Sequence, residues 1–149
     1  MSRRLAVRAV VFLDGKLLCV RLKSYNNVVA GDYWCLPGGT LEDTEALLPA
    51  LRREIIEETN IEPKVGNLLY VQQFGKAGKE HLEFMFHVTN AADFINVDLS
   101  LASHAAKEIE ILDFVDPANT HILPAFLTTE PIAEQIRTSQ PVKFFDYLA

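Results

Sequence analysis

The sequence predicts an α+β fold, or more narrowly a mixed α/β fold, in three layers. Strand patterns lie on both sides of one amphipathic helix, expected from about Ala46 to Thr59, and a further helical segment lies near the end of the chain. A chain with this order of elements packs its helices on a sheet. With 149 residues and 49% hydrophobic content it can bury one core, so we predict a single domain over residues 1–149.

The chain is expected to open with a β-hairpin. The segments Leu5 to Leu13 and Lys16 to Leu22 are rich in valine and leucine, and Asp14-Gly15 between them is a strong turn signal. Lys23 to Tyr33 has little periodicity, so we predict a loop that is long enough to approach a ligand. Trp34 to Leu36 should then form a short strand.

The central helix is expected to turn an apolar face towards the sheet. Four residues should form that face: Leu48, Leu51, Ile55 and Ile56. Pro49 falls in the first turn, where proline is tolerated because the amide groups there lack partners within the helix.

Three further strands are predicted after the helix: Val65 to Phe74, His81 to Thr89, and Glu108 to Val115. A turn from Gly75 to Lys79 should join the first two, and Asn90 to Lys107 is expected to be a long loop before the third. Two later segments are predicted to be helical, with Thr129 as a cap of the second: Ile122 to Leu127 and Pro131 to Thr138. Aromatic residues near the end should close the core or form a subunit contact: Phe144, Phe145 and Tyr147.

Glycine and glutamate residues gather around the predicted central helix. Gly38 and Gly39 precede it, and Glu54, Glu57 and Glu58 share one of its faces because residues three and four apart are neighbours. Like charges so placed repel each other by about a few tenths of a kcal/mol per pair, and a divalent cation would neutralise them. Oxygen ligands favour Mg²⁺, or Mn²⁺ in its place. The glycine turn can also leave a carbonyl oxygen free to point at the metal.

These positions resemble the signature of the Nudix hydrolases. The similarity runs from Gly39 to Ile61, and eight of nine specified positions agree: Gly39, Glu45, Arg53, Glu54, Ile55, Glu57, Glu58 and Ile61. The departure is Asn60, which stands where the family has glycine. After glycine, asparagine tolerates the left-handed conformation best, so we expect the helix to end at this point all the same.

The resemblance implies an α/β/α sandwich with a mixed central sheet. It also implies a Mg²⁺-dependent hydrolase that cleaves the diphosphate linkage of a nucleoside diphosphate derivative or a nucleoside triphosphate. Such a reaction requires in-line attack of water on phosphorus, neutralisation of the phosphate charge and a base that accepts the proton. Glutamates with a metal ion supply all three.

The same resemblance assigns roles to the acidic residues. The metal ligands that it implies are Gly38 or Gly39 through a carbonyl, Glu54, Glu57 and Glu58. Glu57 is also our first choice for the general base, and Arg53, four residues earlier, would orient it through an ion pair. Glu45 would support the loop or a metal-bound water, with Glu42 a weaker candidate beside it. Glu108 is the second candidate for the base and a further metal ligand.

Other polar residues have weaker support as site residues. Glu83 and Glu110 are interpreted as outward-facing strand residues, although either remains an alternative base. Arg21, Lys23 and Tyr25 lie in or next to the first loop and are candidates to contact base, ribose or phosphate. Trp34 could stack on a base, but beside an apolar strand we favour a packing role for it.

Composition restricts the partners. A net charge of −6 argues against binding to nucleic acid in general, whereas a metal-bound nucleotide remains a fitting small-molecule substrate. Cys19 and Cys35 are too few for a disulfide scaffold, and the four histidines show no shared spacing that would indicate a metal site. Neither a signal-peptide pattern nor a membrane-length apolar run occurs, so we expect a cytoplasmic protein. A homodimer is a fair expectation.

Several alternatives stay open. The glutamates could form a solvated acidic face of a helix, although that does not account for the glycine turn or for Glu45. A non-catalytic ligand sensor, an isoprenyl diphosphate isomerase that uses Cys19 or Cys35, and an RNA-end pyrophosphohydrolase are the rival functions. No proline occurs between Pro63 and Pro117, which weakens an assignment to ADP-ribose by the family resemblance.

Overall fold

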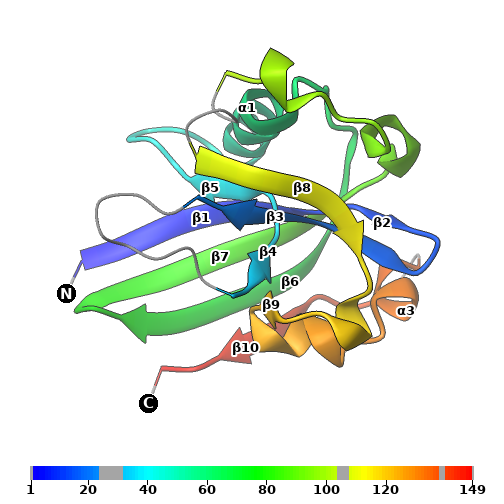
Figure 1. Ribbon diagram of the computed structural model, residues 1–149. Coiled ribbons are helices and arrows are strands. Elements are labelled where there is room, and N and C mark those ends of the chain that lie inside the picture. Colours follow the sequence, from blue (N-terminus) through cyan, green and yellow to red (C-terminus); the bar gives the residue numbers. More distant parts are fainter. Residues whose placement is uncertain (1, 24–31, 104–107, 138–139, 149) are drawn as a thin grey trace.

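The computed structural model describes residues 2–23, 32–103, 108–137 and 140–148 (Figure 1). Within this part of the chain the strands form two sheets. The first, sheet A, has the order β10 (Lys143–Asp146), β6 (Val65–Lys76), β7 (Lys79–Val88), β1 (Ser2–Val10) and β5 (Gly38–Thr40). The second, sheet B, has the order β2 (Phe12–Leu13), β3 (Lys16–Leu22), β4 (Trp34–Cys35) and β9 (Ile122–Leu123), with β8 (Ile109–Val115) paired to β3.

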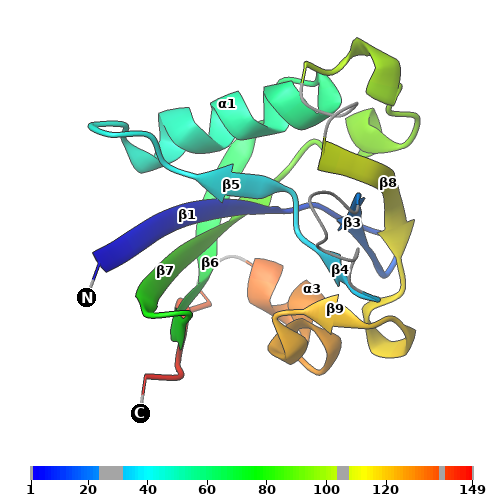
Figure 2. The ribbon, with the colours of Figure 1, turned by 60° about the vertical axis from the view of Figure 1, so that its left-hand side comes forward.

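Sheet A is mixed, as the sequence predicted. β1 runs parallel to β7 and β10 runs parallel to β6, whereas the β6–β7 and β1–β5 pairs are antiparallel. Helix α1 (Leu47–Thr59) covers one side, and the short helix α3 (Ile132–Ile136) lies with the 3₁₀ turn η4 (Ala125–Thr128) on the other (Figure 2). The predicted α+β class and the sandwich of helices around a mixed sheet are therefore confirmed.

Two apolar clusters lie on opposite sides of β1. Val7, Ala9 and Val11 pack with Leu51 and Ile55 of α1, in what we call the helix-side core. Val10 packs instead with residues of β6, β7 and η4, among them Tyr70, Met85 and Leu127, in what we call the C-terminal core. Because alternate residues of a strand point to opposite faces, β1 contributes to both cores and is buried along most of its second half.

Both hairpin turns have the backbone that their sequences favour. Asp14 (φ 51°) and Gly15 (φ 78°) occupy the left-handed region at the β2–β3 turn, and this prediction is confirmed. Ala77 (φ 53°) and Gly78 (φ 77°) do the same at the β6–β7 turn, which is tighter than predicted since Lys76 already pairs with Lys79.

Helix α1 follows the prediction closely. It begins at Leu47 and ends at Thr59, and Asn60 adopts the left-handed conformation (φ 61°, ψ 24°) while its N–H donates to the carbonyl of Ile56 at 2.8 Å. The expected ending at asparagine is thus confirmed. Leu48 was wrongly placed on the buried face, because it is 49% exposed in the first turn and Ala50 fills the buried position instead.

The C-terminal quarter departs from the prediction. Ile122 to Leu127 is not one helix, because Ile122–Leu123 is strand β9 paired with β4, and only Ala125–Thr128 turns as η4. Short apolar runs do not distinguish a buried strand from a helix by their periodicity, which explains the error. Thr129 ends η4 and does not cap α3, which begins after Pro131.

One more segment differs from the expectation, and the aromatic end of the chain agrees with it at Phe145. The predicted loop from Asn90 contains the 3₁₀ turns η1 (Ala91–Phe94) and η2 (Leu99–Leu101), and η3 (Pro117–Asn119) follows β8. Of the aromatic residues near the end of the chain, Phe144 and Phe145 belong to strand β10 and Tyr147 follows it. Phe145 packs on the C-terminal core, as expected, whereas Phe144 is 75% exposed.

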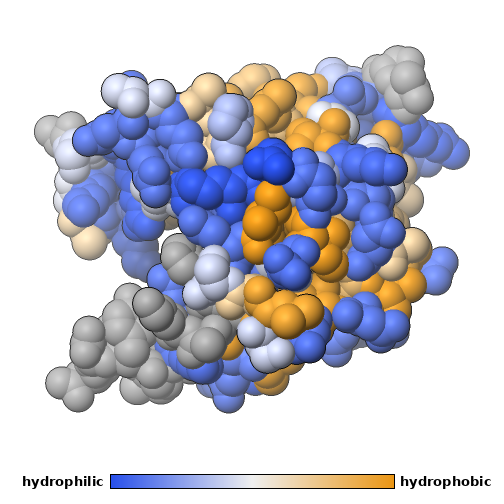
Figure 3. Space-filling view, turned by 90° about the horizontal axis from the view of Figure 1, so that it is seen from above, coloured by the Kyte–Doolittle hydropathy of each residue, from blue (hydrophilic) through white to orange (hydrophobic). Residues whose placement is uncertain are grey.

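The surface above α1 and β8 is mainly hydrophilic with an apolar area near its middle (Figure 3). Exposed apolar side chains from elements on this side include Ile95, Leu101 and Ile111. Apolar areas are common at subunit contacts, and the homodimer stays a prediction. Among the described helices, none is long and apolar enough to cross a membrane.

Candidate active site

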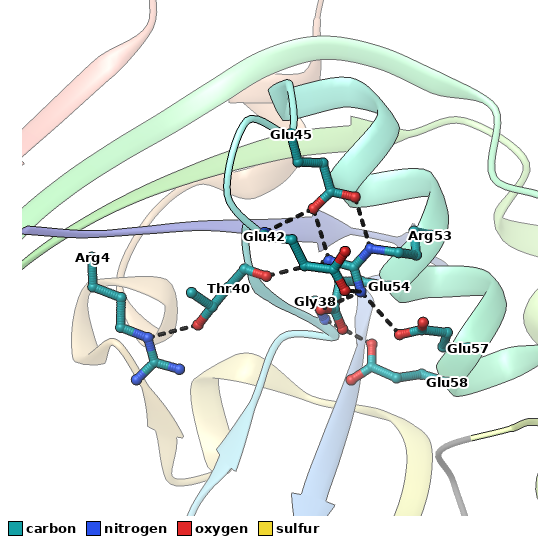
Figure 4. A network of polar contacts seen from close by, with 9 residues as sticks. All are labelled: Arg4, Gly38, Thr40, Glu42, Glu45, Arg53, Glu54, Glu57 and Glu58. Atoms are coloured by element: carbon teal, nitrogen blue, oxygen red, sulfur yellow. Dashed lines mark hydrogen bonds and ion pairs between the residues drawn. The ribbon is translucent and has the colours of Figure 1, made fainter.

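Strand β5 and helix α1 bring Gly38 and the glutamates together, as Figure 4 shows. The backbone N–H of Gly38 donates to Oε2 of Glu58 at 2.9 Å, across twenty residues of sequence. Gly38 has a φ of 141°, and a Cβ at this position would lie 2.1 Å from the carbonyl oxygen of Val7. Only glycine fits there, so the close pairing of β5 with β1 sets the place where the Glu58 carboxylate binds.

Gly39 makes room for a second carboxylate. A Cβ on Gly39 would lie 2.6 Å from the carboxyl carbon of Glu54, so this carboxylate sits directly over the glycine backbone. The two glycines therefore let two carboxylates of α1 approach the same short stretch of β5.

Arg53 organises the remaining carboxylates. Its Nε and Nη2 donate to the two oxygens of Glu45 at 2.7 and 2.9 Å, a bidentate pair. Its Nη1 lies 3.1 Å from Oε1 of Glu54 and 3.1 Å from Oε2 of Glu57. Hydrogen bonding to Arg53 lowers the pKa of Glu45 to about 2. Arg53 thus ties the loop before α1 to the acidic face of the helix, and its guanidinium is fully engaged within the protein.

Burial disfavours the ionised forms of two carboxylates in the site. Glu58 is only 6% exposed, and desolvation raises its pKa to about 8 even though Arg8 opposes the shift. The carboxylates of Glu54 and Glu108 add to this rise. The pKa of Glu54 is also raised, mainly by burial. Two carboxylates whose ionised forms are costly in the protein lie next to each other, which favours a bound cation.

The donor set fits a hard divalent ion. Within the described residues no three histidine, cysteine, aspartate or glutamate side chains already form a cage for a metal. Mg²⁺, however, is usually held by one or two carboxylates, with water and substrate phosphates completing its shell. Glu54 and Glu58 beside the Gly38-Gly39 backbone supply that kind of partial shell.

Comparison with known proteins decides the family. A model of the NUDIX domain matches residues 2–134. The chain belongs to the NUDIX family. This confirms the resemblance that the glycines and glutamates indicated.

Relatives agree with this assignment. A curated protein named ADP-ribose pyrophosphatase, from Methanocaldococcus jannaschii, is 34% identical over 108 residues, which make up 72% of this chain and 60% of that protein. The match thus spans less than two thirds of the relative's length. The family and this relative support the prediction of a pyrophosphohydrolase.

Solved structures share the fold. The E. coli ORF135 protein is 24% identical, with a TM-score of 0.69 over 94% of this chain and 96% of that one. A MutT NUDIX hydrolase from Burkholderia pseudomallei is 20% identical, with a TM-score of 0.68 over 92% and 100% of the two chains. At these identities the similarity shows the NUDIX fold and not the substrate.

The downstream glutamates differ in their positions in this NUDIX domain. Glu108 is exposed just before β8, and its carbonyl accepts a hydrogen bond from the backbone of Lys23 at 2.9 Å. Glu110 is exposed, as interpreted. For Glu83 the interpretation was wrong, because this residue is only 9% exposed and lies on the face of sheet A that is covered by other side chains.

The predicted substrate-binding residues that the structure describes lie on or beside β3 and β4. Nη2 of Arg21 lies 3.6 Å from Oδ1 of Asp32, and Lys23 follows the end of β3. Trp34 packs against the C-terminal core, which confirms the favoured packing role. Tyr25 lies outside the described residues. The contacts of these residues with a substrate stay predictions.

The sequence analysis missed Arg8 and Gln72. Arg8 donates from Nη1 to the carbonyl of Leu36 at 3.3 Å, and its Nε lies 3.7 Å from Oε1 of Glu83. Gln72 donates to the same oxygen of Glu83 at 3.1 Å. One signal was present: Arg8 interrupts an otherwise apolar run of β1, and a charge at a strand position expected to be buried calls for a partner.

Proposed function

We propose that this NUDIX domain is a Mg²⁺-dependent hydrolase that cleaves the phosphoanhydride bond of a nucleoside diphosphate derivative, with Mn²⁺ able to replace Mg²⁺. The observation that carries the proposal is the pair of desolvated carboxylates, Glu54 and Glu58, beside the Gly38-Gly39 backbone. Buried carboxylates without a full complement of cationic partners are suited to a divalent cation and its phosphate ligands.

The metal ion and the site residues have different roles in the proposed reaction. When bound, the divalent cation supplies neutralisation of the phosphate charge and activation of the attacking water. The Gly38 N–H holds one oxygen of Glu58, so the carboxylate keeps its direction. Arg53 fixes the rotamers of Glu54 and Glu57 while it is itself held by Glu45. This arrangement supports a positioning role for Arg53 and Glu45.

Glu57 is the proposed general base. Its side chain is 23% exposed, compared with 14% for Glu54, so water reaches Glu57 more readily. Its Oε2 binds Arg53, which orients the carboxylate towards the other site residues. Glu108 is the second candidate for this role. It lies just before β8, and its charge contributes to the raised pKa of Glu58.

The substrate class is a nucleotide joined to a second group through a diphosphate. The curated relative is named for ADP-ribose, so ADP-ribose is the first substrate to test, ahead of nucleotide sugars, dinucleoside polyphosphates and nucleoside triphosphates. The net charge of −6 favours small molecules over RNA ends. The two free cysteines accord with a cytoplasmic location.

An isomerase reaction that uses a cysteine is less well supported. Burial raises the pKa of the Cys35 thiol even though Arg8 opposes the shift, and the pKa of Cys19 is raised as well. A thiol of this kind is protonated and a poor nucleophile at neutral pH.

Product analysis over this substrate panel, with and without Mg²⁺, tests the proposal. We expect Glu57→Gln and Glu58→Gln to abolish turnover while each variant still melts cooperatively. Glu110→Gln is the matched control, because it removes an exposed glutamate from β8, and it should retain wild-type turnover. Wild-type protein that hydrolyses none of these compounds, and that takes up no Mg²⁺ or Mn²⁺ in calorimetry with a nucleotide present, would contradict the proposed function.

A further inference from the structure

A buried row of polar side chains crosses sheet A next to the carboxylate site. Arg8 on β1, Glu83 on β7 and Gln72 on β6 form this row, which we call the polar row. In the strand register, Ala6 pairs with Glu83, and Glu83 pairs with Gln72. Arg8 lies on the same face of sheet A as Val10, because the two residues are two positions apart on β1. The polar row therefore borders the C-terminal core, and the sheet separates it from α1.

The row is too buried to be a solvated surface feature. Gln72 is 5% exposed and Glu83 is 9% exposed, whereas the Arg8 side chain remains 24% exposed. A buried carboxylate requires hydrogen bonds and a cation, and here Gln72 supplies the hydrogen bond and Arg8 the charge. Arg8 is therefore the most exposed member of the row.

Arg8 differs from Arg53 in how far its donors are used. Arg53 makes five hydrogen bonds of 2.7 to 3.3 Å to neighbouring oxygens. Arg8 makes one, from Nη1 to Leu36 at 3.3 Å, and its 3.7 Å separation from Glu83 exceeds a hydrogen bond, as far as the described residues show. A guanidinium carries five N–H donors, so Arg8 retains donors for an anion.

Arg8 lies one strand away from the carboxylate site, beside β5, which is the edge strand of sheet A. It pairs across the strands with Gly38, whose N–H binds Glu58, and its charge acts on both Glu54 and Glu58. Arg8 and the two carboxylates thus stand on either side of the same stretch of β5. Because β5 is the edge strand of sheet A, a diphosphate bound at Glu54 and Glu58 can extend past this edge, where its other oxygens meet the face that carries Arg8.

We propose that Arg8 binds non-bridging oxygens of the substrate diphosphate and that Glu83, held by Gln72, positions its guanidinium. The inference rests on the proposed hydrolase function and adds a second anion-binding group to that site, at a place that the glycine and glutamate pattern does not cover. Planar guanidinium groups bind phosphate oxygens through two parallel hydrogen bonds, which an amine cannot reproduce.

Equilibrium binding of an α,β-methylene nucleoside diphosphate, measured by calorimetry with Mg²⁺ present, tests the role of Arg8. We expect Arg8→Gln to weaken binding about 10- to 100-fold, and Arg8→Lys to restore part of the loss. KM for the best substrate should rise in parallel. Arg52→Gln is the matched control, because Arg52 is an exposed arginine of α1 paired with Glu62, and its binding should not change. Thermal melting of each variant identifies loss of fold, and a folded Arg8→Gln protein with wild-type affinity overturns the inference.

A double-mutant cycle with Glu83→Gln tests positioning. We expect Glu83→Gln to raise KM several-fold in the wild-type background and to have almost no further effect beside Arg8→Gln, because Glu83 acts through Arg8. A fall in kcat with unchanged KM would instead make Glu83 a base and overturn its positioning role. If wild-type protein turns over no substrate, the proposed function fails; if it turns over substrate and the cycle is additive, only this inference fails.

Discussion

The β5–α1 region and the C-terminal region, described over residues 122–137 and 140–146, bury chemically different side chains although each contributes a strand to sheet A. In the β5–α1 region two carboxylates, Glu54 and Glu58, are desolvated, and the pKa of each is raised. In the C-terminal region the buried residues are mainly apolar, and the rings of Phe126 and Phe145 stack with centroids 3.9 Å apart. The first region thus retains charge that disfavours the metal-free fold, whereas the second stabilises it.

Buried polar groups in the two regions also differ in their partners. Gln135 of α3 is neutral, and its Nε2 donates to the carbonyls of Leu69 and Pro141 at 3.0 and 2.7 Å. Its hydrogen bonds are complete without a ligand. Glu58 accepts one backbone hydrogen bond and still has a raised pKa. The difference teaches that burial alone does not mark a functional residue, whereas a buried charge with incomplete compensation does.

The largest expected effect is on stability in the C-terminal region. Phe126→Ala removes a ring that stacks on Phe145 and contacts Tyr70, and it should lower the free energy of unfolding by about 3–5 kcal/mol. Urea unfolding measures this change. Turnover by the folded fraction should stay close to that of the wild type. A large loss of kcat in folded protein would contradict the purely stabilising role given to the C-terminal region.

Glu58→Gln should have the opposite sign in metal-free protein. The pKa of Glu58 is raised to about 8, so its contribution to stability is greatest when it is protonated, below the ordinary value of 4.5. That contribution falls as the pH rises from 4.5 to about 8. The glutamine variant avoids this loss and should be more stable by on the order of a few kcal/mol at pH 8, but not at pH 4.

Melting curves in EDTA across this pH range measure the effect. Adding Mg²⁺ with a non-hydrolysable nucleotide should raise the Tm of the wild type and leave that of Glu58→Gln nearly unchanged. A variant that is less stable than the wild type at pH 8 without metal would contradict the assignment of Glu58 as a costly buried charge.

Arg53→Gln should reduce activity without a comparable loss of stability. The variant loses the bidentate contact with Glu45 and the contacts that orient Glu54 and Glu57. Loss of such support typically reduces activity by about 10- to 100-fold. Steady-state kinetics measure the loss, with Arg137→Gln as a control because Arg137 forms a similar but exposed pair with Glu134. Equal losses in the two variants would mean that Arg53 acts only through net charge.

The smallest expected effect concerns the loop before α1. Thr44 has a φ of 65°, a left-handed conformation that is costly for a β-branched residue. Thr44→Gly should raise the free energy of unfolding by less than about 1 kcal/mol, because relief of strain is partly offset by greater freedom of the unfolded chain. Asp43→Gly, at a neighbouring position without a positive φ, should instead lower it. Chemical denaturation of both variants decides the sign.

Local rules predicted the β2–β3 turn and helix α1 well. The turn at Asp14-Gly15, the span of α1 and its ending at Asn60 depend on neighbours within a few residues, so the sequence contains most of the information. Among the site residues, the contact of Arg53 with Glu57 also follows from helical spacing.

Long-range pairing limited the prediction elsewhere. β9 exists because Trp34 and Cys35 lie beside it, and β10 exists because it adds to the edge of β6. Glu83 is buried because Arg8 and Gln72, eleven or more residues away in sequence, compensate it. A local sequence pattern does not identify which distant strands or side chains will pair, and the polar row was missed for the same reason.

The parallel pairing of β1 with β7 has a consequence for synthesis on the ribosome. Every glycine and glutamate of β5 and α1 has been translated by residue 59, yet β1 meets its β7 partner only after residues 79–88 emerge. β10 adds to β6 later still, at residues 143–146. A nascent chain therefore contains the acidic residues before the strands that complete their supporting sheet, and sheet A is complete only after residue 146 has emerged.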